Sequence, residues 1–300
     1  MDEQQLLSVK RQFEEYRKLF EEYLTATQEL RAEGIPPRLS EAMEYSLMGG
    51  GKRLRPVLCL AAAERCGLEA KKALPMALAV EMLHTATLIH DDLPCMDDDD
   101  MRRGRPSNHA KFGETLAVLA GDALMAQPYE FALNELKEIS ADKVLAAMKI
   151  FAHATGAAGV IGGQVLDMFE EAPDDPDYVR RIAKLKTGAL LEAAVTTGAA
   201  LATSDKKLLS ACREYALHLG SAFQIVDDIL DVTSTAEELG KTPGKDSEQG
   251  KLTHVTVYGM EKAREMASQE SEAARRALSE LLKEDDFLLL LPDYLVDRSH

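Results

Sequence analysis

Residues 88–104 read LIHDDLPCMDDDDMRRG, which places six aspartates directly against two arginines. Ionised aspartates repel one another at neutral pH, and two arginines offset only part of this charge. A divalent cation would offset the remainder, and carboxylate oxygens are hard ligands that favour Mg²⁺ or Ca²⁺. The alternative is a solvated acidic loop, because most acidic runs are exposed to water.

A second acidic cluster lies in residues 219–231, LGSAFQIVDDILD, within an apolar pattern of helical period. Asp227 and Asp231 are four residues apart and therefore share one face of a helix. Carboxylates on the apolar side of a helix are costly unless they are paired or bind a metal. A structural helix with exposed acids is the alternative, but two such clusters in one chain favour a metal site.

Helical periodicity extends over almost the whole chain, and the alternating patterns typical of strands are missing. We find no internal repeat and no linker, so we predict one all-α domain spanning residues 1–300. The expected helices are 3–33, 39–48, 56–66, 70–90, 112–136, 142–169, 178–203, 206–232, 258–283 and 287–296.

Composition argues against several kinds of partner and location. The net charge of −16 disfavours nucleic acid and anionic membrane surfaces, and an anionic substrate must therefore meet bound metal or a local basic group. The four cysteines form no CxxC pair, which is typical of thiols in a reducing cytoplasm. The N-terminus lacks the pattern of a signal peptide, and the apolar run 287–291 is too short to cross a bilayer. We expect a soluble, cytoplasmic protein with no integral membrane segment.

Three motifs together resemble those of trans-isoprenyl diphosphate synthases. Residues 88–104 are similar to the first aspartate-rich motif of that family, and residues 219–231 are similar to the second. Residues 50–56, GGKRLRP, resemble the basic motif that precedes both, and the match runs in family order from about residue 40 to 256. The resemblance implies a single-domain bundle of helices around a deep central cavity, paired as a homodimer.

The activity implied by the resemblance is the condensation of isopentenyl diphosphate with an allylic diphosphate: dimethylallyl, geranyl or farnesyl. Magnesium neutralises the allylic diphosphate and makes it a better leaving group. The double bond of isopentenyl diphosphate then attacks the allylic cation, and loss of a proton completes the reaction. The protein contributes positioning and electrostatics, so no nucleophilic Ser or Cys is required.

The resemblance also implies three Mg²⁺ ions between the two aspartate motifs. The direct ligands would be Asp91, Asp97 and Asp227. Three further aspartates would support the direct ligands or contact the metal ions through water: Asp92, Asp228 and Asp231.

The spacing of the first motif has a consequence for its backbone. Asp91 and Asp97 are six residues apart, which does not keep both on one face of a straight helix. Pro94 ends regular helix, so we expect a two-residue insertion to bulge outward while Asp97 returns beside Asp91. Residues 98–100 are expected to be solvated neighbours of the ligands.

The remaining candidate residues follow from their positions in the motifs that carry the resemblance. Isopentenyl diphosphate would be held by Lys52, Arg55, His84 and Arg103. The allylic diphosphate would be held by Arg102, Lys186, Lys241 and Lys251. Thr187 and Gln224 would flank the developing cation and, with Lys186, form the catalytic group. Gln164 and Asp167 are expected to support them by hydrogen bonding, and His90 is expected to be structural.

Product length should depend on the helix that ends at Asp91. Thr87 and Ala86 lie about one turn nearer the expected cavity floor. Bacterial farnesyl synthases with this inserted motif often carry an aromatic residue at the position of Ala86. A methyl group cannot block a growing chain as a tyrosine would, so we favour a twenty-carbon product. A strict farnesyl diphosphate synthase is the alternative.

Other classes fit the sequence less well. A class I terpene cyclase usually has a different second metal motif and lines its cavity with aromatic residues, which form only 5% of this chain. A non-catalytic subunit of another prenyl synthase would be expected to have lost parts of the aspartate motifs. An acidic helical scaffold is the third alternative.

Overall fold

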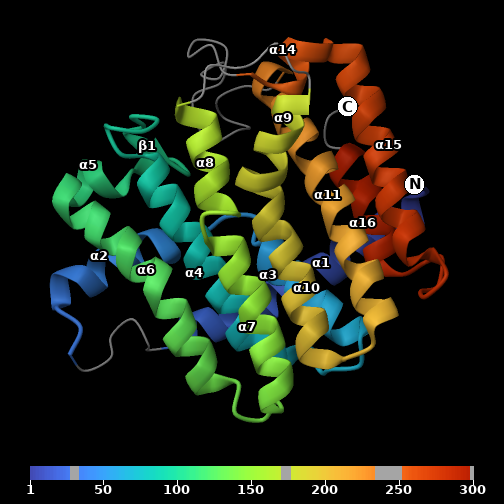
Figure 1. The fold of residues 1–300 in the computed structure, drawn as a ribbon, viewed down its shortest axis with the longest axis horizontal. Coiled ribbons are helices and arrows are strands. Elements are labelled where there is room, and N and C mark those ends of the chain that lie inside the picture. Colours follow the sequence, from blue (N-terminus) through green and yellow to red (C-terminus); the bar gives the residue numbers. More distant parts are fainter. Residues whose placement is uncertain (28–33, 170–176, 234–251, 298–300) are drawn as a thin grey trace.

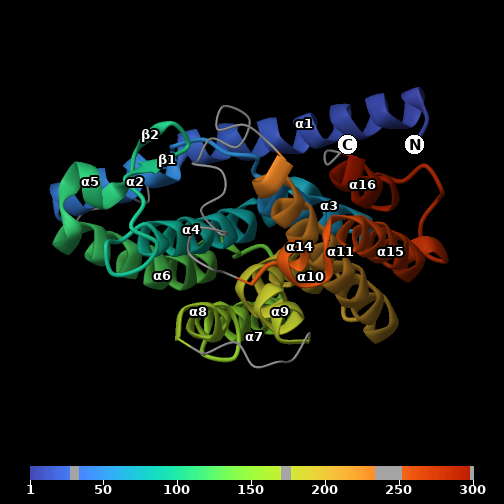
Figure 2. The same cartoon turned by 90° about the horizontal axis from the view of Figure 1, so that it is seen from above.

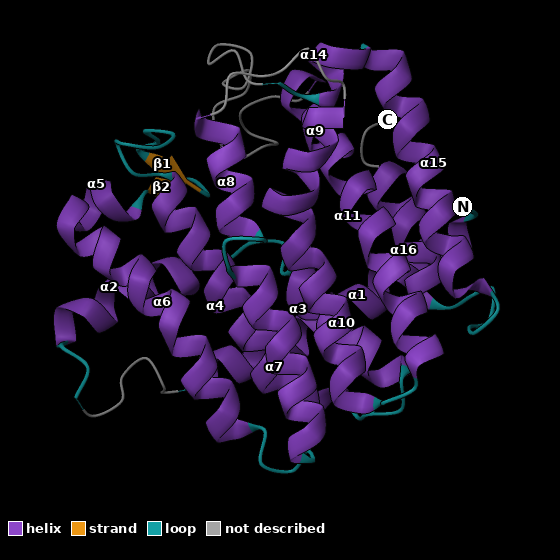
Figure 3. Ribbon diagram, in the orientation of Figure 1, coloured by secondary structure: helices purple, strands orange, loops and turns teal. Residues whose placement is uncertain are grey.

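The computed structural model describes residues 1–27, 34–169, 177–233 and 252–297, and it confirms the all-α prediction (Figure 3). Within these residues the strands are β1 (Met101–Arg102) and β2 (Arg105–Pro106), which pair antiparallel. The helices are α1 (Glu3–Ala26), α2 (Pro37–Leu47), α3 (Leu54–Arg65), α4 (Leu74–Asp91), α5 (Asn108–Phe112), α6 (Glu114–Glu135), α7 (Ala141–Thr155), α8 (Val160–Phe169), α9 (Asp177–Ile182), α10 (Ala189–Ala202), α11 (Lys206–Thr233), α14 (His254–Tyr258), α15 (Met260–Ser279) and α16 (Phe287–Val296). A 3₁₀ turn, Ala70–Ala73, precedes α4, and a π-helical segment, Ala183–Gly188, joins α9 to α10.

The centre of the bundle consists of α3, α4 and α10, which are apolar on nearly all sides. Such helices must be surrounded by others, since no face of them is polar enough for water. Seen from above, α1 crosses one side of this centre, whereas α7, α8 and α9 cover the opposite side (Figure 2). The acidic segment after α4 and the second acidic cluster on α11 lie toward the same end of the bundle (Figure 1).

The expected helices 142–169 and 178–203 are divided in the structure, and two others begin slightly later than expected, after a glycine. Gly113 (φ 87°) separates α5 from α6, and Gly259 (φ 81°) separates α14 from α15. The predicted helix 142–169 is interrupted between Thr155 and Val160, where Gly156 caps α7. A positive φ is cheap only for glycine, so a helical pattern that crosses such a residue need not be one helix.

Two helical stretches have the length and composition of a membrane span: Ala70–Asp91 and Ala141–Met168. They are weak grounds for a membrane protein, because core helices of soluble proteins pass the same test. The first stretch is 78% buried inside the bundle, as a core helix should be. The second is 44% buried, and part of it forms a wall of the apolar cavity described below.

Candidate active site

The first acidic segment folds back on itself after α4. The helix ends at Asp91 with Asp92 as its cap, before Pro94, which disfavours helix in the residue preceding it. The backbone N–H of Asp97 donates to the carbonyl oxygen of Asp91 at 2.8 Å. Asp97 therefore returns beside Asp91 despite the six-residue spacing.

Asp99 corrects the expectation that residues 98–100 are solvated. Asp98 and Asp100 are exposed, but Asp99 is only 7% exposed and lines a cavity together with Asp97. Its backbone N–H donates to the carbonyl oxygen of Asp92 at 3.2 Å, which draws the chain inward. An acidic run in the sequence does not reveal which of its members such a turn buries.

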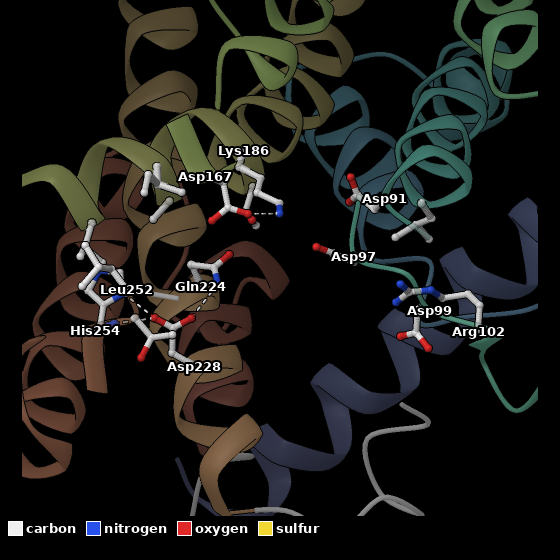
Figure 4. Close-up of a pocket in the computed structure, with 16 residues that line it drawn as sticks. Asp91, Asp97, Asp99, Arg102, Asp167, Lys186, Gln224, Asp228, Leu252 and His254 are labelled. Atoms are coloured by element: carbon white, nitrogen blue, oxygen red, sulfur yellow. Dashed lines mark hydrogen bonds and ion pairs between the residues drawn. The ribbon is translucent and has the colours of Figure 1, made fainter. Parts of the chain in front are cut away.

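A cavity of about 220 Å³ separates two polar walls (Figure 4). Asp91 and Asp97 lie on one side of it, and Gln224 and Asp228 lie on the other. Burial raises the pKa of Asp91 to about 6, although the charges of Lys186 and Arg102 oppose the shift. A carboxylate that is costly to ionise in the protein alone gains most from a bound cation.

Lys186 projects into this cavity from the π-helical segment and donates to Asp167 Oδ2 at 2.6 Å. Burial lowers the pKa of Lys186, but the charges of Asp91 and Asp167 outweigh burial, so its pKa is raised. The segment also packs closely on α8, where a Cβ on Gly163 would lie 2.2 Å from the backbone nitrogen of Lys186. The same segment brings Thr187 into the cavity wall.

The second acidic cluster is divided by the helical period of α11. Asp228 is buried and faces the cavity, where it accepts hydrogen bonds from Gln224 and His254. Asp231, one turn away, is also buried. Asp227 is half-buried, and its charge partly opposes the lowering of the Arg55 pKa that burial causes.

The basic residues expected to hold isopentenyl diphosphate lie in part together. Arg55 Nη1 is 3.3 Å from His84 Nε2, and Arg103 donates to the carbonyl oxygen of Gly50. Burial, with the charges of Arg55 and then Arg103, holds the pKa of His84 well below its usual value. Lys52 is exposed on the loop that carries this motif.

Burial also lowers the pKa of Arg55 and that of Arg103. The Nε atom of Arg55 is buried and has no hydrogen-bond partner in the described part of the chain. Burial and mutual repulsion destabilise these cations, and a bound anion would offset that cost. The cluster is therefore suited to bind an anion.

Two adjacent arginines point in different directions from the β1 hairpin. Arg102 Nε donates to Asp92 Oδ1 at 3.0 Å, and its guanidinium lines the acidic cavity. Arg103 (φ 53°) turns toward the loop that contains Gly50. Of the other lysines expected near the allylic diphosphate, Lys241 and Lys251 lie outside the described residues.

An apolar cavity of about 440 Å³ continues from Asp91 and Lys186 into the bundle between α4, α6 and α8. Its wall includes Thr87, Met125 and Val160. His90 and Gln164 also border it, and His90 Nε2 lies 3.2 Å from the carbonyl oxygen of Val118. Ala86 does not line this cavity: it is fully buried in the core, so Thr87 is the position of the pair that faces the cavity.

A model of the family described as polyprenyl synthetase matches residues 36–286. The chain belongs to the polyprenyl synthetase family. This polyprenyl synthetase is 45% identical over 269 residues to a dimethylallyltranstransferase of Fischerella ambigua, covering 89% of this chain and 78% of the relative. It is 47% identical over 249 residues to a chloroplastic heterodimeric geranylgeranyl pyrophosphate synthase large subunit of Arabidopsis thaliana, covering 81% of this chain and 67% of the relative.

The fold of this polyprenyl synthetase agrees with a solved geranyltransferase from Helicobacter pylori, a complex with magnesium and isoprenyl diphosphate. The two share 32% identity and a TM-score of 0.82, over 99% of this chain and 98% of the other. These relationships make the chain a short-chain trans-prenyltransferase.

The donor set of this polyprenyl synthetase suits magnesium. In the described part of the chain no three acidic, His or Cys side chains converge as a ready-made metal centre. The acids instead occupy opposite sides of a cavity, which leaves room for the oxygens of a diphosphate between them (Figure 4). Carboxylate and phosphate oxygens are the ligands that Mg²⁺ prefers.

Two features of the site were missed by the sequence analysis. Arg53, in the left-handed conformation (φ 53°), donates to Glu81 Oε1 at 2.7 Å and to Glu21 Oε1 at 2.8 Å. His254 donates to Asp228 from a segment 26 residues away. The one signal available in the sequence was Glu81, an acid within an apolar helix, because a buried acid needs a partner such as Arg53.

Proposed function

We propose that this polyprenyl synthetase adds isopentenyl diphosphate to dimethylallyl, geranyl and farnesyl diphosphate and releases a twenty-carbon product, geranylgeranyl diphosphate. The observation that supports this product is the apolar cavity of about 440 Å³ that begins at Asp91 and Lys186. Its wall carries Thr87, Met125 and Val160, which are aliphatic or small, where an aromatic side chain would block an elongating chain.

Magnesium would be held by Asp91 and Asp97 from one motif and by Asp227 from the other, with three ions in the site. Bound magnesium would neutralise the diphosphate and make it a better leaving group. Asp92 and Asp228 would support the metal site without binding the ions directly, since Asp92 pairs with Arg102 and Asp228 is hydrogen-bonded to His254. Asp231 would act in the same indirect way.

The allylic diphosphate would lie between Arg102 and Lys186, which reach the acidic cavity from different elements. Lys241 and Lys251 are proposed to contact the same group. When the diphosphate leaves, positive charge develops on the allylic carbon beside Thr187 and Gln224. Their oxygens would stabilise that charge, and Lys186 would hold the leaving group.

Isopentenyl diphosphate would occupy the basic site of Arg55, Arg103 and His84, with Lys52 at its exposed edge. Guanidinium groups suit bidentate contacts with phosphate. Because His84 is neutral, it can accept a hydrogen bond from Arg55 and need not add a repulsive charge. The double bond of this substrate would then be directed toward the allylic carbon, and the released diphosphate would take up its proton.

We further propose that the protein is a cytoplasmic homodimer. Leu119 and Leu133 of α6 and Leu145 of α7 are each more than half exposed. Exposed apolar side chains on neighbouring helices are typical of a surface that another chain covers. The four cysteines are all free thiols, as expected in a reducing compartment.

The test is product chromatography with radiolabelled isopentenyl diphosphate, Mg²⁺ and each of the three allylic primers. We expect the dimethylallyl and farnesyl primers to converge on a twenty-carbon product. A product that ends cleanly at fifteen carbons would show a farnesyl diphosphate synthase. Turnover that persists after chelation of divalent cations would contradict the metal assignment.

A further inference from the structure

Three protein donors converge on Asp228. Its Oδ2 accepts from the backbone N–H of His254 at 2.8 Å and from Nδ1 of His254 at 2.7 Å. Its Oδ1 accepts from Nε2 of Gln224 at 2.7 Å. Asp228 and His254 are 5% and 2% exposed, so water competes little for these bonds. The carboxylate is therefore fixed between α11 and the start of α14.

This arrangement determines which end of the Gln224 amide faces the cavity. A carboxylate only accepts hydrogen bonds, so Gln224 presents its NH₂ group to Asp228, and Nδ1 of His254 carries a proton. The carbonyl oxygen of Gln224 then points away from Asp228, toward the side of the cavity where Lys186 lies (Figure 4). An amide released from Asp228 could present either end, because the two ends have nearly the same shape.

We propose that His254 is a positioning residue for prenyl transfer: it fixes Asp228, which turns the carbonyl oxygen of Gln224 toward the carbon on which positive charge develops. The inference rests on the proposed role of Gln224 beside that cation. An oxygen that is already oriented stabilises the charge without reorganisation, whereas an NH₂ group in its place would repel the cation. Asp228 then orients Gln224 and is not itself a ligand of magnesium.

The first test compares His254→Asn with His254→Gln. The side-chain nitrogen of asparagine can occupy the position of Nδ1, whereas that of glutamine reaches the position of Nε2 and loses Asp228. We expect kcat to fall roughly tenfold in His254→Gln and to be largely retained in His254→Asn. KM for isopentenyl diphosphate should be the same in both, because Arg55 and Arg103 are not touched. Equal losses in the two variants would contradict a role for the Nδ1 hydrogen bond.

A double-mutant cycle shows whether His254 acts through Gln224. Gln224→Ala should lower kcat by roughly 10²-fold, as loss of one oriented group does. Adding His254→Gln to that variant should cost less than about twofold, since residues that act as a unit are not additive. Multiplied losses would overturn the proposal. So would a raised Mg²⁺ requirement in His254→Gln, because Asp228 would then be a metal ligand.

A readout that does not depend on turnover separates this inference from the proposed function. The readout is the NMR signal of the side-chain amide of Gln224 in protein labelled with ¹⁵N-glutamine. This signal is identified as the one that is absent from the spectrum of Gln224→Ala. That signal should shift and exchange faster with water in His254→Gln but not in His254→Asn. A signal unchanged in both variants would sink the inference, even in an active enzyme. His218→Ala is the matched control, because His218 on α11 pairs with Glu270 at 2.7 Å and both side chains are about one-third exposed.

Discussion

A Cβ atom on Gly51 would lie 2.6 Å from Cζ of Arg103, and the φ of Gly51 is +127°. Gly51→Ala should therefore displace Arg103 from the basic site. We expect KM for isopentenyl diphosphate to rise roughly tenfold or more, the worth of a charge-assisted hydrogen bond, while KM for the allylic substrate stays unchanged. Steady-state kinetics with each substrate varied in turn would measure both.

Gly67→Ala is the control for backbone strain. Gly67 also has a positive φ (+96°), but a Cβ there meets nothing within 4 Å. Its cost should appear in stability alone, at about 1 kcal/mol, with both KM values retained. A similar rise in both KM values of Gly51→Ala would show general damage to the fold.

His84 predicts a pH dependence whose sign follows from its lowered pKa. Burial and the charges of Arg55 and Arg103 favour the neutral imidazole in the folded state. The unfolded chain then binds the proton more readily, so the contribution of His84 is fully present above pH 6.5 and is lost as pH falls toward the folded-state pKa. Relative to His84→Gln, the wild type should lose up to about 1.4 kcal/mol of unfolding free energy per pH unit in that window.

Urea unfolding of both proteins between pH 5 and 7.5 measures this difference. Taking the difference between the two proteins removes groups that titrate equally in both, among them the buried carboxylates. Parallel curves would mean that the folded protein tolerates a charged His84. Excess diphosphate should weaken the dependence, because an anion offsets the cost of protonating the ring.

At the scale of elements, a buried ion pair fixes the basic loop to α4. The side chains of Arg53 and Glu81 are 0% and 2% exposed, and Arg53 also donates to the carbonyl oxygen of Leu47 at 2.9 Å. Glu81→Ala should destabilise the protein by about 3–5 kcal/mol, because it leaves Arg53 charged and buried without this partner. Chemical denaturation would measure the loss.

The exposed pair Arg11–Glu15 on α1 provides the comparison. Its nitrogen and oxygen are 3.8 Å apart, and both side chains are about two-thirds exposed or more. Glu15→Ala should therefore cost less than about 1 kcal/mol. Equal losses in the two variants would mean that the Arg53–Glu81 pair contributes little beyond a surface interaction.

Most helices could be predicted from the sequence because the pattern that specifies each one lies within a short stretch of residues. The apolar period of α3, α4, α10 and α11 is visible in short windows of sequence. The division of helix 142–169 was not predicted from the sequence, although Gly156 caps α7 at that point. The π-helical segment, which is in close contact with α8 at Gly163, was not predicted either. Residues in long motifs were assigned from the resemblance. His254 was not, because its bond to Asp228 spans distant positions.

At the scale of the whole molecule, the proposed dimer predicts an effect of exposed leucines on assembly. Leu133 on α6 is 57% exposed, and Leu7, on the separate helix α1, is 60% exposed. The two helices lie apart in the bundle (Figure 2). Leu133→Arg should shift the protein toward monomer in sedimentation velocity, because it places a charge in a surface that a second copy would bury. Leu7→Arg should leave the sedimentation coefficient unchanged. Identical behaviour of the two variants would argue against α6 as part of the interface.

The apolar cavity lies between α4, α6 and α8, so the length of the product should respond to residues of the cavity wall and not to residues of the core behind it. Thr87→Phe fills the cavity about one turn from Asp91 and should shift the product to fifteen carbons or fewer. Met125→Ala removes a flexible side chain that stands one turn before Tyr129, and should lengthen the product.

The variant Ala86→Tyr tests whether Ala86 belongs to the cavity wall or to the packed core. Ala86 is 0% exposed and packed, so this change should overfill the core, cost about 1–3 kcal/mol and lower the melting temperature. Chromatography of products from the three variants, with thermal unfolding of each, measures both effects. A stable Ala86→Tyr protein with a short product would instead place Ala86 in the path of the growing chain.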